Sequence, residues 1–260
     1  MSGIGTIPDI NGYNTRMSMS LIDKIYFMDK IGDANLIVDF GCADGAILKH
    51  LAKLFPDYQY VGFDISPEML EIARNGSPSN ITYTSNWDEV LKLIEGKKAA
   101  ITLSSLIHEV YTYCSEKEVE EFWGRVWNSC FSYVVIREMM VSKSASRQSD
   151  PIAVARIRQC YDKNKLQEWE TQWGSLTENW SLVHFLLTYR YTENWEREFR
   201  ENYLPVALED FFPLIPPKYY PTFMEHYTLP FNRKTIEQDF GIQLQDRTHL
   251  KLILELHNEQ

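Results

Sequence analysis

The stretch "NLIVDFGCADGAILKHLAKLFPDYQYVGFDIS", residues 35–66, decides the fold of this 260-residue chain. An apolar run rich in strand-forming residues, 36–40, leads into a loop of small residues, and an amphipathic segment, 46–55, follows. A second apolar run, 58–64, ends in Asp64. This order predicts a buried strand, a tight loop, a helix and a second buried strand.

The same alternation continues as far as residue 140. We predict further strands at 80–85, 99–105 and 132–140, and helices at 12–31, 67–74, 88–96 and 115–130. Strands that alternate with helices form a parallel sheet with helices on both faces. The sequence therefore predicts an α/β fold with a doubly wound, mostly parallel, Rossmann-like sheet.

The alternation divides the chain into three expected segments. Residues 1–141 form a cofactor-binding core that includes an N-terminal helix. Residues 142–220 are long, helical and aromatic, and we expect them to form a helical insertion that acts as a lid over the carboxyl edge of the sheet. Residues 221–260 read as strand, short helix and strand, which would complete the core sheet.

Bulk properties narrow the class of protein. The net charge of −10 disfavours broad electrostatic capture of nucleic acid. No apolar run is long enough to cross a membrane, and the N-terminus lacks the pattern of a secretory signal. The four cysteines are widely spaced and the histidines show no metal-ligand spacing. We therefore expect a reduced, cytoplasmic protein without a metal site.

The loop of small residues is the expected cofactor site, because ligands of open parallel sheets bind at the carboxyl ends of the strands. Gly41, Ala43 and Gly45 let a ligand approach the backbone closely. Asp64 lies 19 residues beyond Gly45, where an acid commonly accepts hydrogen bonds from ribose hydroxyls. A dinucleotide fingerprint needs glycines at i, i+2 and i+5, and Ala43 and Ala46 occupy the second and third of these positions.

The motif "VDFGCADG", residues 38–45, resembles the first motif of the class I S-adenosylmethionine-dependent methyltransferases, an acid followed by G-x-G-x-G. Ala43 stands in place of the middle glycine. The segments "GYNTRM", 12–17, and "LSSLIHEV", 103–110, resemble those that flank the cofactor in such enzymes. The resemblance covers roughly residues 35–138 and returns at the tail strands. It implies a seven-stranded sheet, S-adenosyl-L-methionine as cofactor and methyltransferase activity.

The resemblance also implies roles for individual residues. Asp39 would organise the loop or reach the methionine amine, and it could instead be a structural cap for the loop amides. Asp64 would hold the ribose hydroxyls. The other implied cofactor contacts are Gly41, Ala43 and Gly45 with methionine and ribose, Ile65 and Met69 with adenine, Asn86 and Trp87 near the adenine amino group, and Ser104 beside the sulfonium. Met69 could also serve the core alone.

Two residues past the fourth strand are candidates for catalysis. The sulfonium is already an activated methyl donor, so the protein mainly aligns the acceptor with it. A weak nucleophile also needs a base. His108 has the right proton affinity, and Glu109 could orient it or act as the base itself. The alternative is that both residues cap a helix or bond to the insertion.

These observations favour a methyltransferase whose acceptor is unidentified. A small molecule or a compact polar group is the favoured acceptor, and a structured RNA remains an alternative because the insertion is rich in aromatic and Arg residues. A non-catalytic S-adenosylmethionine-binding scaffold is the second hypothesis. An NAD-dependent oxidoreductase on a similar sheet is the third, and the glycine spacing argues against it.

Overall fold

The computed structural model describes residues 21–257, and these residues form two compact units. Unit 1 and unit 2 are each built from separated stretches of the chain. Unit 1 contains residues 21–138, 216–225 and 251–257, and unit 2 contains residues 139–215 and 226–250. The division differs from the expected segments by three to five residues at two boundaries, 139–141 and 216–220, and by a longer stretch near the C-terminus. Residues 226–250, expected with the final strands, group with the insertion because Ile236 and Phe240 are part of its hydrophobic core.

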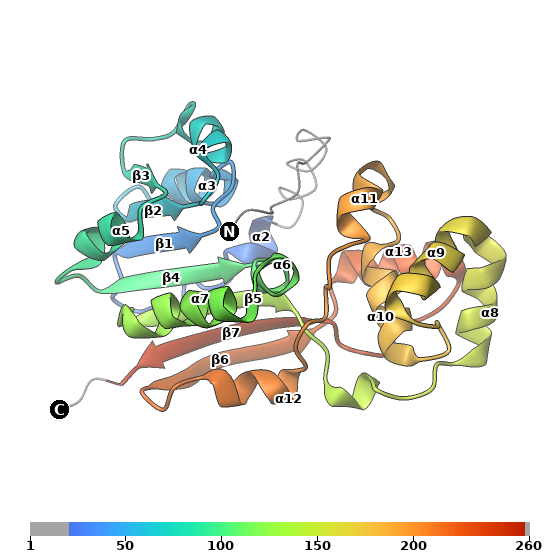
Figure 1. The fold of residues 1–260 in the computed structure, drawn as a ribbon. Helices are drawn as coiled ribbons and strands as arrows, with labels where there is room; N and C mark the ends of the chain where they lie inside the picture. Colours follow the sequence, from blue (N-terminus) through green and yellow to red (C-terminus); the bar gives the residue numbers. More distant parts are fainter. Residues whose placement is uncertain (1–20, 258–260) are drawn as a thin grey trace. The chain divides into compact units, whose positions relative to one another are not determined.

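A seven-stranded sheet runs in the order β3-β2-β1-β4-β5-β7-β6. The strands are β1 (Leu36–Phe40), β2 (Gln59–Phe63), β3 (Ile81–Thr84), β4 (Ala99–Ser104), β5 (Tyr133–Met139), β6 (Tyr219–Tyr227) and β7 (His249–Leu256). The first five pair in parallel. Figure 1 shows β7 running opposite to β4. The prediction of an α/β fold with a mostly parallel, seven-stranded sheet is confirmed.

Two helices of unit 1 begin at residues that are typical helix caps. The helices of this unit are α2 (Leu21–Lys24), α3 (Ala46–Leu54), α4 (Pro67–Arg74), α5 (Trp87–Ile94), α6 (Ile107–Tyr113) and α7 (Glu116–Asn128). Ser66 accepts a hydrogen bond at the start of α4, with Pro67 in the first turn. Ser115 and Glu118 form a capping box on α7. Each of the strands β1 to β4 is therefore followed by at least one helix of unit 1.

The helix predicted at 12–31 extends over little of the described chain. Residues 12–20 lie outside the described residues, α2 ends at Lys24, and turns occupy residues 25–30. Tertiary contacts explain the turns. The Tyr26 hydroxyl donates to the backbone oxygens of Ile136 and Leu252, both at 2.9 Å, and Phe27 is fully buried. The apolar residues whose spacing suggested one long helix thus pack against the sheet from a series of turns.

Unit 2 consists mainly of helices. They are η1 (Lys143–Ala145), α8 (Pro151–Cys160), α9 (Lys163–Trp173), α10 (Asn179–Thr188), η2 (Thr192–Asn194), α11 (Trp195–Glu198), α12 (Leu208–Phe211), η3 (Phe212–Leu214) and α13 (Pro230–Phe240). Asp162 separates α8 from α9, because its carboxylate accepts from the backbone N–H groups of Asn164 and Lys165. Among the helices of residues 21–257, none combines the length and the apolar content that a membrane crossing needs.

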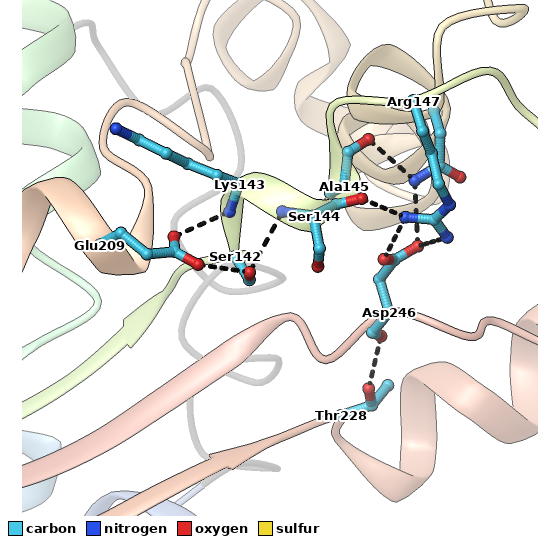
Figure 2. A network of polar contacts seen from close by, with 9 residues as sticks. Ser142, Lys143, Ser144, Ala145, Arg147, Glu209, Thr228 and Asp246 are labelled. Carbon is cyan, nitrogen blue, oxygen red and sulfur yellow. Dashed lines mark hydrogen bonds and ion pairs between the residues drawn. The ribbon is translucent and has the colours of Figure 1, made fainter.

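Side-chain carboxylates tie the first loop of unit 2 in place. Figure 2 shows Glu209 accepting from the Ser142 hydroxyl at 2.5 Å and from the Lys143 N–H at 2.8 Å. Asp246 binds both outer nitrogens of the Arg147 guanidinium, at 2.8 and 2.9 Å. Paired hydrogen bonds of this kind hold a guanidinium more firmly than a single contact does. The segment that leaves β5 is therefore anchored at two points.

Candidate functional site

The loop between β1 and α3 is built on left-handed backbone. Gly41, Ala43 and Gly45 have φ angles of 79°, 47° and 71°. The N–H groups of Gly41 and Cys42 both donate to the Phe63 oxygen, at 2.7 and 3.1 Å, which fixes the loop against the end of β2. Ala43 is the position where the resembling motif has glycine, and a left-handed alanine costs about 1–2 kcal/mol. The surrounding hydrogen bonds hold that conformation.

Asp64 connects this loop to the start of α4. One carboxylate oxygen accepts from the Ala43 N–H at 2.9 Å and the other accepts from the Ser66 N–H at 2.9 Å. Only 9% of the residue is exposed, and burial raises the pKa of its carboxyl although the two backbone donors oppose that change. Asp64 therefore has a structural task in addition to the ribose contact that was predicted for it.

Among the residues that the structure describes, one carboxylate oxygen of Asp39 has a hydrogen-bond partner and the other has none. Thr102 on β4 donates to Asp39 Oδ1 at 2.8 Å, across the β1–β4 register. Within residues 21–257, Asp39 Oδ2 and the hydroxyl of Ser104 are buried polar atoms that have no hydrogen-bond partner. Burial raises the pKa of Asp39 to about 6. A buried polar atom without a partner is costly, so a ligand that formed hydrogen bonds with both groups would remove that cost.

The glycines of the loop lie close to neighbouring side chains in addition to having positive φ. A Cβ on Gly45 would lie 2.3 Å from the Tyr83 hydroxyl, and a Cβ on Gly41 would lie 2.8 Å from Leu106 Cδ1. At both distances a neighbouring side chain would have to shift, and the ring of the buried Tyr83 is less free to do so than the end of Leu106. The loop therefore packs closely on β3 and on the segment that follows β4, and its backbone is brought to the carboxyl edge of the sheet.

The residues predicted to contact adenine lie around the ends of β2 and β3. Ile65 and Met69 are half-buried, at the start of α4. Asn86 is exposed and caps α5, where its side chain accepts from the Asp88 N–H. The half-buried Trp87 packs its ring on Phe40 and Phe63, with centroids 5.2 and 5.1 Å apart. The structure thus gives Asn86 and Trp87 local packing tasks, and their contact with adenine stays a prediction.

His108 lies on α6, a helix that was not predicted. Its Nδ1 lies 2.9 Å from Glu138 Oε1, and His108 and Glu138 are 4% and 1% exposed. Glu138 also accepts from the Ile107 N–H at 2.6 Å, at the start of the same helix. Glu109 is half-buried on the adjacent position. The structure therefore pairs His108 with an acid 30 residues away, at the end of β5.

Three charged residues of this region, Lys24, Arg137 and Glu138, were not assigned to the cofactor site by the sequence analysis. Lys24 on α2 is 2% exposed, and burial together with the Arg137 charge lowers its pKa to about 8. Arg137 is buried on β5 and donates to Asp23 at 3.0 Å and to the Ser105 hydroxyl at 2.8 Å. Arg137 and Glu138 are consecutive charges in an otherwise apolar strand, which is the signal that could have found them.

The site residues fit S-adenosylmethionine. The carboxyl ends of the adjacent strands β1, β2 and β4 bring together the loop, Asp39, Asp64 and Ser104. Asp39 Oδ2 is an acceptor for a cationic group, and the backbone of a glycine-lined loop admits close contact. All of these residues belong to unit 1.

Comparison with known proteins agrees with this geometry. Residues 37–129 match the family model described as "Methyltransferase domain". Human N-acetylserotonin methyltransferase, solved with S-adenosylmethionine, is similar in fold, with a TM-score of 0.52, 12% identity, and coverage of 95% of this chain and 54% of that one. The pyocyanin biosynthetic protein PhzM has a TM-score of 0.51 and 12% identity, with 95% and 58% of the two chains covered.

A methyltransferase from Archaeoglobus fulgidus described as S-adenosylmethionine-dependent covers 95% of this chain and 100% of its own, at 13% identity and a TM-score of 0.48. No curated protein matches the sequence. At these identities the structural likeness concerns the fold alone.

Proposed function

We propose that this chain, which carries a class I S-adenosylmethionine-dependent methyltransferase domain, transfers the methyl group to a small molecule or to a compact polar group. The observation that carries the proposal is the buried Asp39 Oδ2, which within residues 21–257 has no hydrogen-bond partner and lies beside the left-handed loop. A cationic cofactor would supply the missing partner.

Each cofactor contact follows from the position of a group. Asp39 Oδ2 would accept from the methionine ammonium, directly or through water. The backbone of Gly41, Ala43 and Gly45 would lie against the methionine and ribose, and Asp64 would accept from the ribose hydroxyls. Ser104 would stand beside the sulfonium. When bound, S-adenosylmethionine supplies an activated methyl group.

His108 is the proposed general base. Its imidazole lies after β4, at the carboxyl edge of the sheet that carries the proposed cofactor contacts. A neutral imidazole removes a proton from a hydroxyl or a similar acceptor as the new bond forms. Glu109, on the next position, is the alternative base. The chemistry of an oxygen acceptor therefore suits this site better than that of a group that is already nucleophilic.

The net charge supports the choice of acceptor class. A chain with a charge of −10 repels the phosphate backbone of a nucleic acid unless a local basic patch compensates. A structured RNA is the alternative acceptor in the same proposal. A cytoplasmic location is also proposed, and the four free cysteines support it.

The proposal is tested by label transfer from methyl-tritiated S-adenosylmethionine into a host extract separated into small-molecule, RNA, DNA and protein fractions. Label in the small-molecule fraction supports the proposal, and label in RNA would replace the acceptor class. Calorimetry with S-adenosylhomocysteine runs in parallel. Binding without any label would favour a non-catalytic scaffold, and absence of binding would contradict the proposal.

A matched pair of variants addresses the base. His108→Gln should lower label transfer about 10²- to 10⁴-fold, the usual contribution of a general base, and leave the affinity for S-adenosylhomocysteine within about threefold. His50→Gln is the control, because His50 is a half-exposed residue of α3. Equal losses of transfer and of binding in His108→Gln would make the residue structural.

A further inference from the structure

We propose that unit 2 binds the C-terminal end of an extended peptide, which pairs with residues 242–245 as an added strand and places its carboxylate on Arg156. The site is a cavity of about 310 Å³ between α8, α10 and residues 241–246. Every residue that lines the cavity belongs to unit 2. The inference does not depend on methyl transfer, because it concerns a ligand of unit 2 alone.

Residues 242–245 have the burial pattern of a strand but no partner strand. Burial alternates along them, with Ile242 and Leu244 buried and Gln243 and Gln245 exposed, which is the period of extended backbone. Among the described residues, none of their backbone N–H groups has a hydrogen-bond partner. Unpaired main chain of this kind is a template for pairing with another extended chain.

Apolar side chains line the cavity beside this segment. Leu182 and Leu186 of α10 and Ile242 of the segment are 4%, 3% and 8% exposed. The volume of about 310 Å³ is at the lower end of the range for ligand pockets. The cavity therefore suits the last side chain of a peptide, and the preceding residues of the peptide would lie along the segment.

The charge at one end of the segment selects a carboxylate. Arg156 is exposed on α8, and Nη1 of its guanidinium donates to the Gly241 oxygen, directly before the segment. Within residues 21–257, Nε and Nη2 of Arg156 have no hydrogen-bond partner. A guanidinium that is held at one nitrogen and open at the other two can bind both oxygens of a carboxylate.

The other charged groups that line the cavity are already compensated. Arg147 and Asp246 bind each other through two hydrogen bonds, at 2.8 and 2.9 Å (Figure 2). Asp150 caps α8, where it lies at the positive end of the helix dipole. Arg156 is therefore the anchor for an anion. In an antiparallel pair, a peptide with its carboxylate at Arg156 runs along the segment with its amino end toward Asp246.

The test is hydrogen exchange of the full-length protein, measured by mass spectrometry with and without peptide. The probes are pools of N-acetylated tetrapeptides with random leading residues, a final leucine, isoleucine, valine or phenylalanine, and a free carboxylate. Pools suffice because main-chain pairing provides affinity for many sequences. Exchange in fragments that contain residues 242–245 should slow about tenfold when the peptide concentration exceeds the Kd about tenfold.

Loss of the charge on either partner should weaken binding. The same pools with an amidated C-terminus should bind about 10- to 100-fold more weakly, because a hydrogen bond between charged groups is lost. Arg156→Gln should weaken the binding of the carboxylate pools to the same extent and should leave the binding of the amidated pools unchanged.

Arg158→Gln is the matched control, because Arg158 is exposed on the same helix, pairs with Glu170 and does not line the cavity. The affinity of this variant for the carboxylate pools should stay within about threefold of the original. Should Arg156→Gln fail to fold by circular dichroism, the comparison of carboxylate and amidated pools on the original protein decides.

Three results would overturn the inference. The first is unchanged exchange of residues 242–245 with every pool, including the case in which protection appears elsewhere in the chain. The second is equal affinity for the carboxylate and amidated pools. The third is binding of N-acetyl-leucine as tight as that of the peptides, which would replace the peptide by a small carboxylic acid.

Discussion

Asp39→Asn should stabilise the cofactor-free protein and weaken its binding of cofactor. Burial raises the pKa of Asp39 from 3.8 to about 6, so the ionised carboxylate costs the folded state about 3 kcal/mol, at about 1.4 kcal/mol per pH unit. Asparagine has the same shape without the charge, and its Oδ1 still accepts from Thr102. The attraction between Lys24 and Asp39 is already part of this pKa. The amide NH₂ that replaces the buried Oδ2 also needs an acceptor, which reduces the expected net gain to about 1–3 kcal/mol.

The stability that Asp39→Asn gains over the original protein should increase as the pH rises. The folded protein keeps the Asp39 proton to higher pH than the unfolded chain does. The penalty is therefore absent below about pH 4, grows between about pH 4 and 6, and is constant above that range. The difference in the free energy of unfolding between Asp39→Asn and the original protein should follow the same curve.

Calorimetry measures both consequences. The unfolding temperature of cofactor-free Asp39→Asn should rise by several degrees at pH 8 and by less at pH 5. The affinity for S-adenosylhomocysteine at pH 8 should fall about 10- to 100-fold, because a hydrogen bond to a charged group contributes about 1.5–3 kcal/mol. Asp57→Asn, at an exposed acid, is the control and should change neither quantity. A less stable Asp39→Asn at pH 8, or unchanged affinity, would refute the reasoning.

Three further substitutions test the loop and unit 2. Asp64→Ala should lower the free energy of unfolding in urea by about 2–4 kcal/mol, because two backbone donors lose their acceptor. It should also weaken the binding of S-adenosylhomocysteine, measured by calorimetry, at least tenfold. Unchanged binding would contradict the ribose contact of Asp64. Gly45→Ala should lower the free energy of unfolding by at least about 2 kcal/mol more than Gly76→Ala does. Both glycines have positive φ, but only a Cβ at position 45 would clash, with Tyr83. Equal losses in the two variants would contradict the clash. Asp246→Ala should lower the free energy of unfolding in urea by about 1–3 kcal/mol. A decrease below about 0.5 kcal/mol would show that the polar network of Figure 2 does not stabilise unit 2.

The sequence predicted the parts of the fold that depend on local patterns. The apolar runs that became β1 and β2 and the glycines of the loop between them lie where they were expected, because strand burial and left-handed backbone select residue types strongly. The first residues of α4 and α7 also follow local patterns, because helix caps favour serine followed by proline or by glutamate three residues later. Local signals thus located the carboxyl edge of the sheet and the candidate loop.

The parts that were missed depend on contacts between distant residues. The seven residues of α6 are too few to show a helical period, and they follow Ser105, whose φ is 55°. The pairing of His108 with Glu138 joins two segments 30 residues apart, and only the strand register brings them together. The turns after Lys24 replace a predicted helix because Tyr26 bonds to β5 and β7.

Unit 2 is made from two stretches of chain, and neither is complete alone. Val183 and Phe185 of the first stretch share a core with Ile236 and Phe240 of the second, and Tyr189 donates to Asp239 at 2.7 Å across the two. Excision of residues 139–215 would therefore leave apolar side chains of α13 in water, and the remnant would be prone to aggregate. A relative that lost or gained this unit would need two coordinated changes in its gene, so the two stretches should be inherited together.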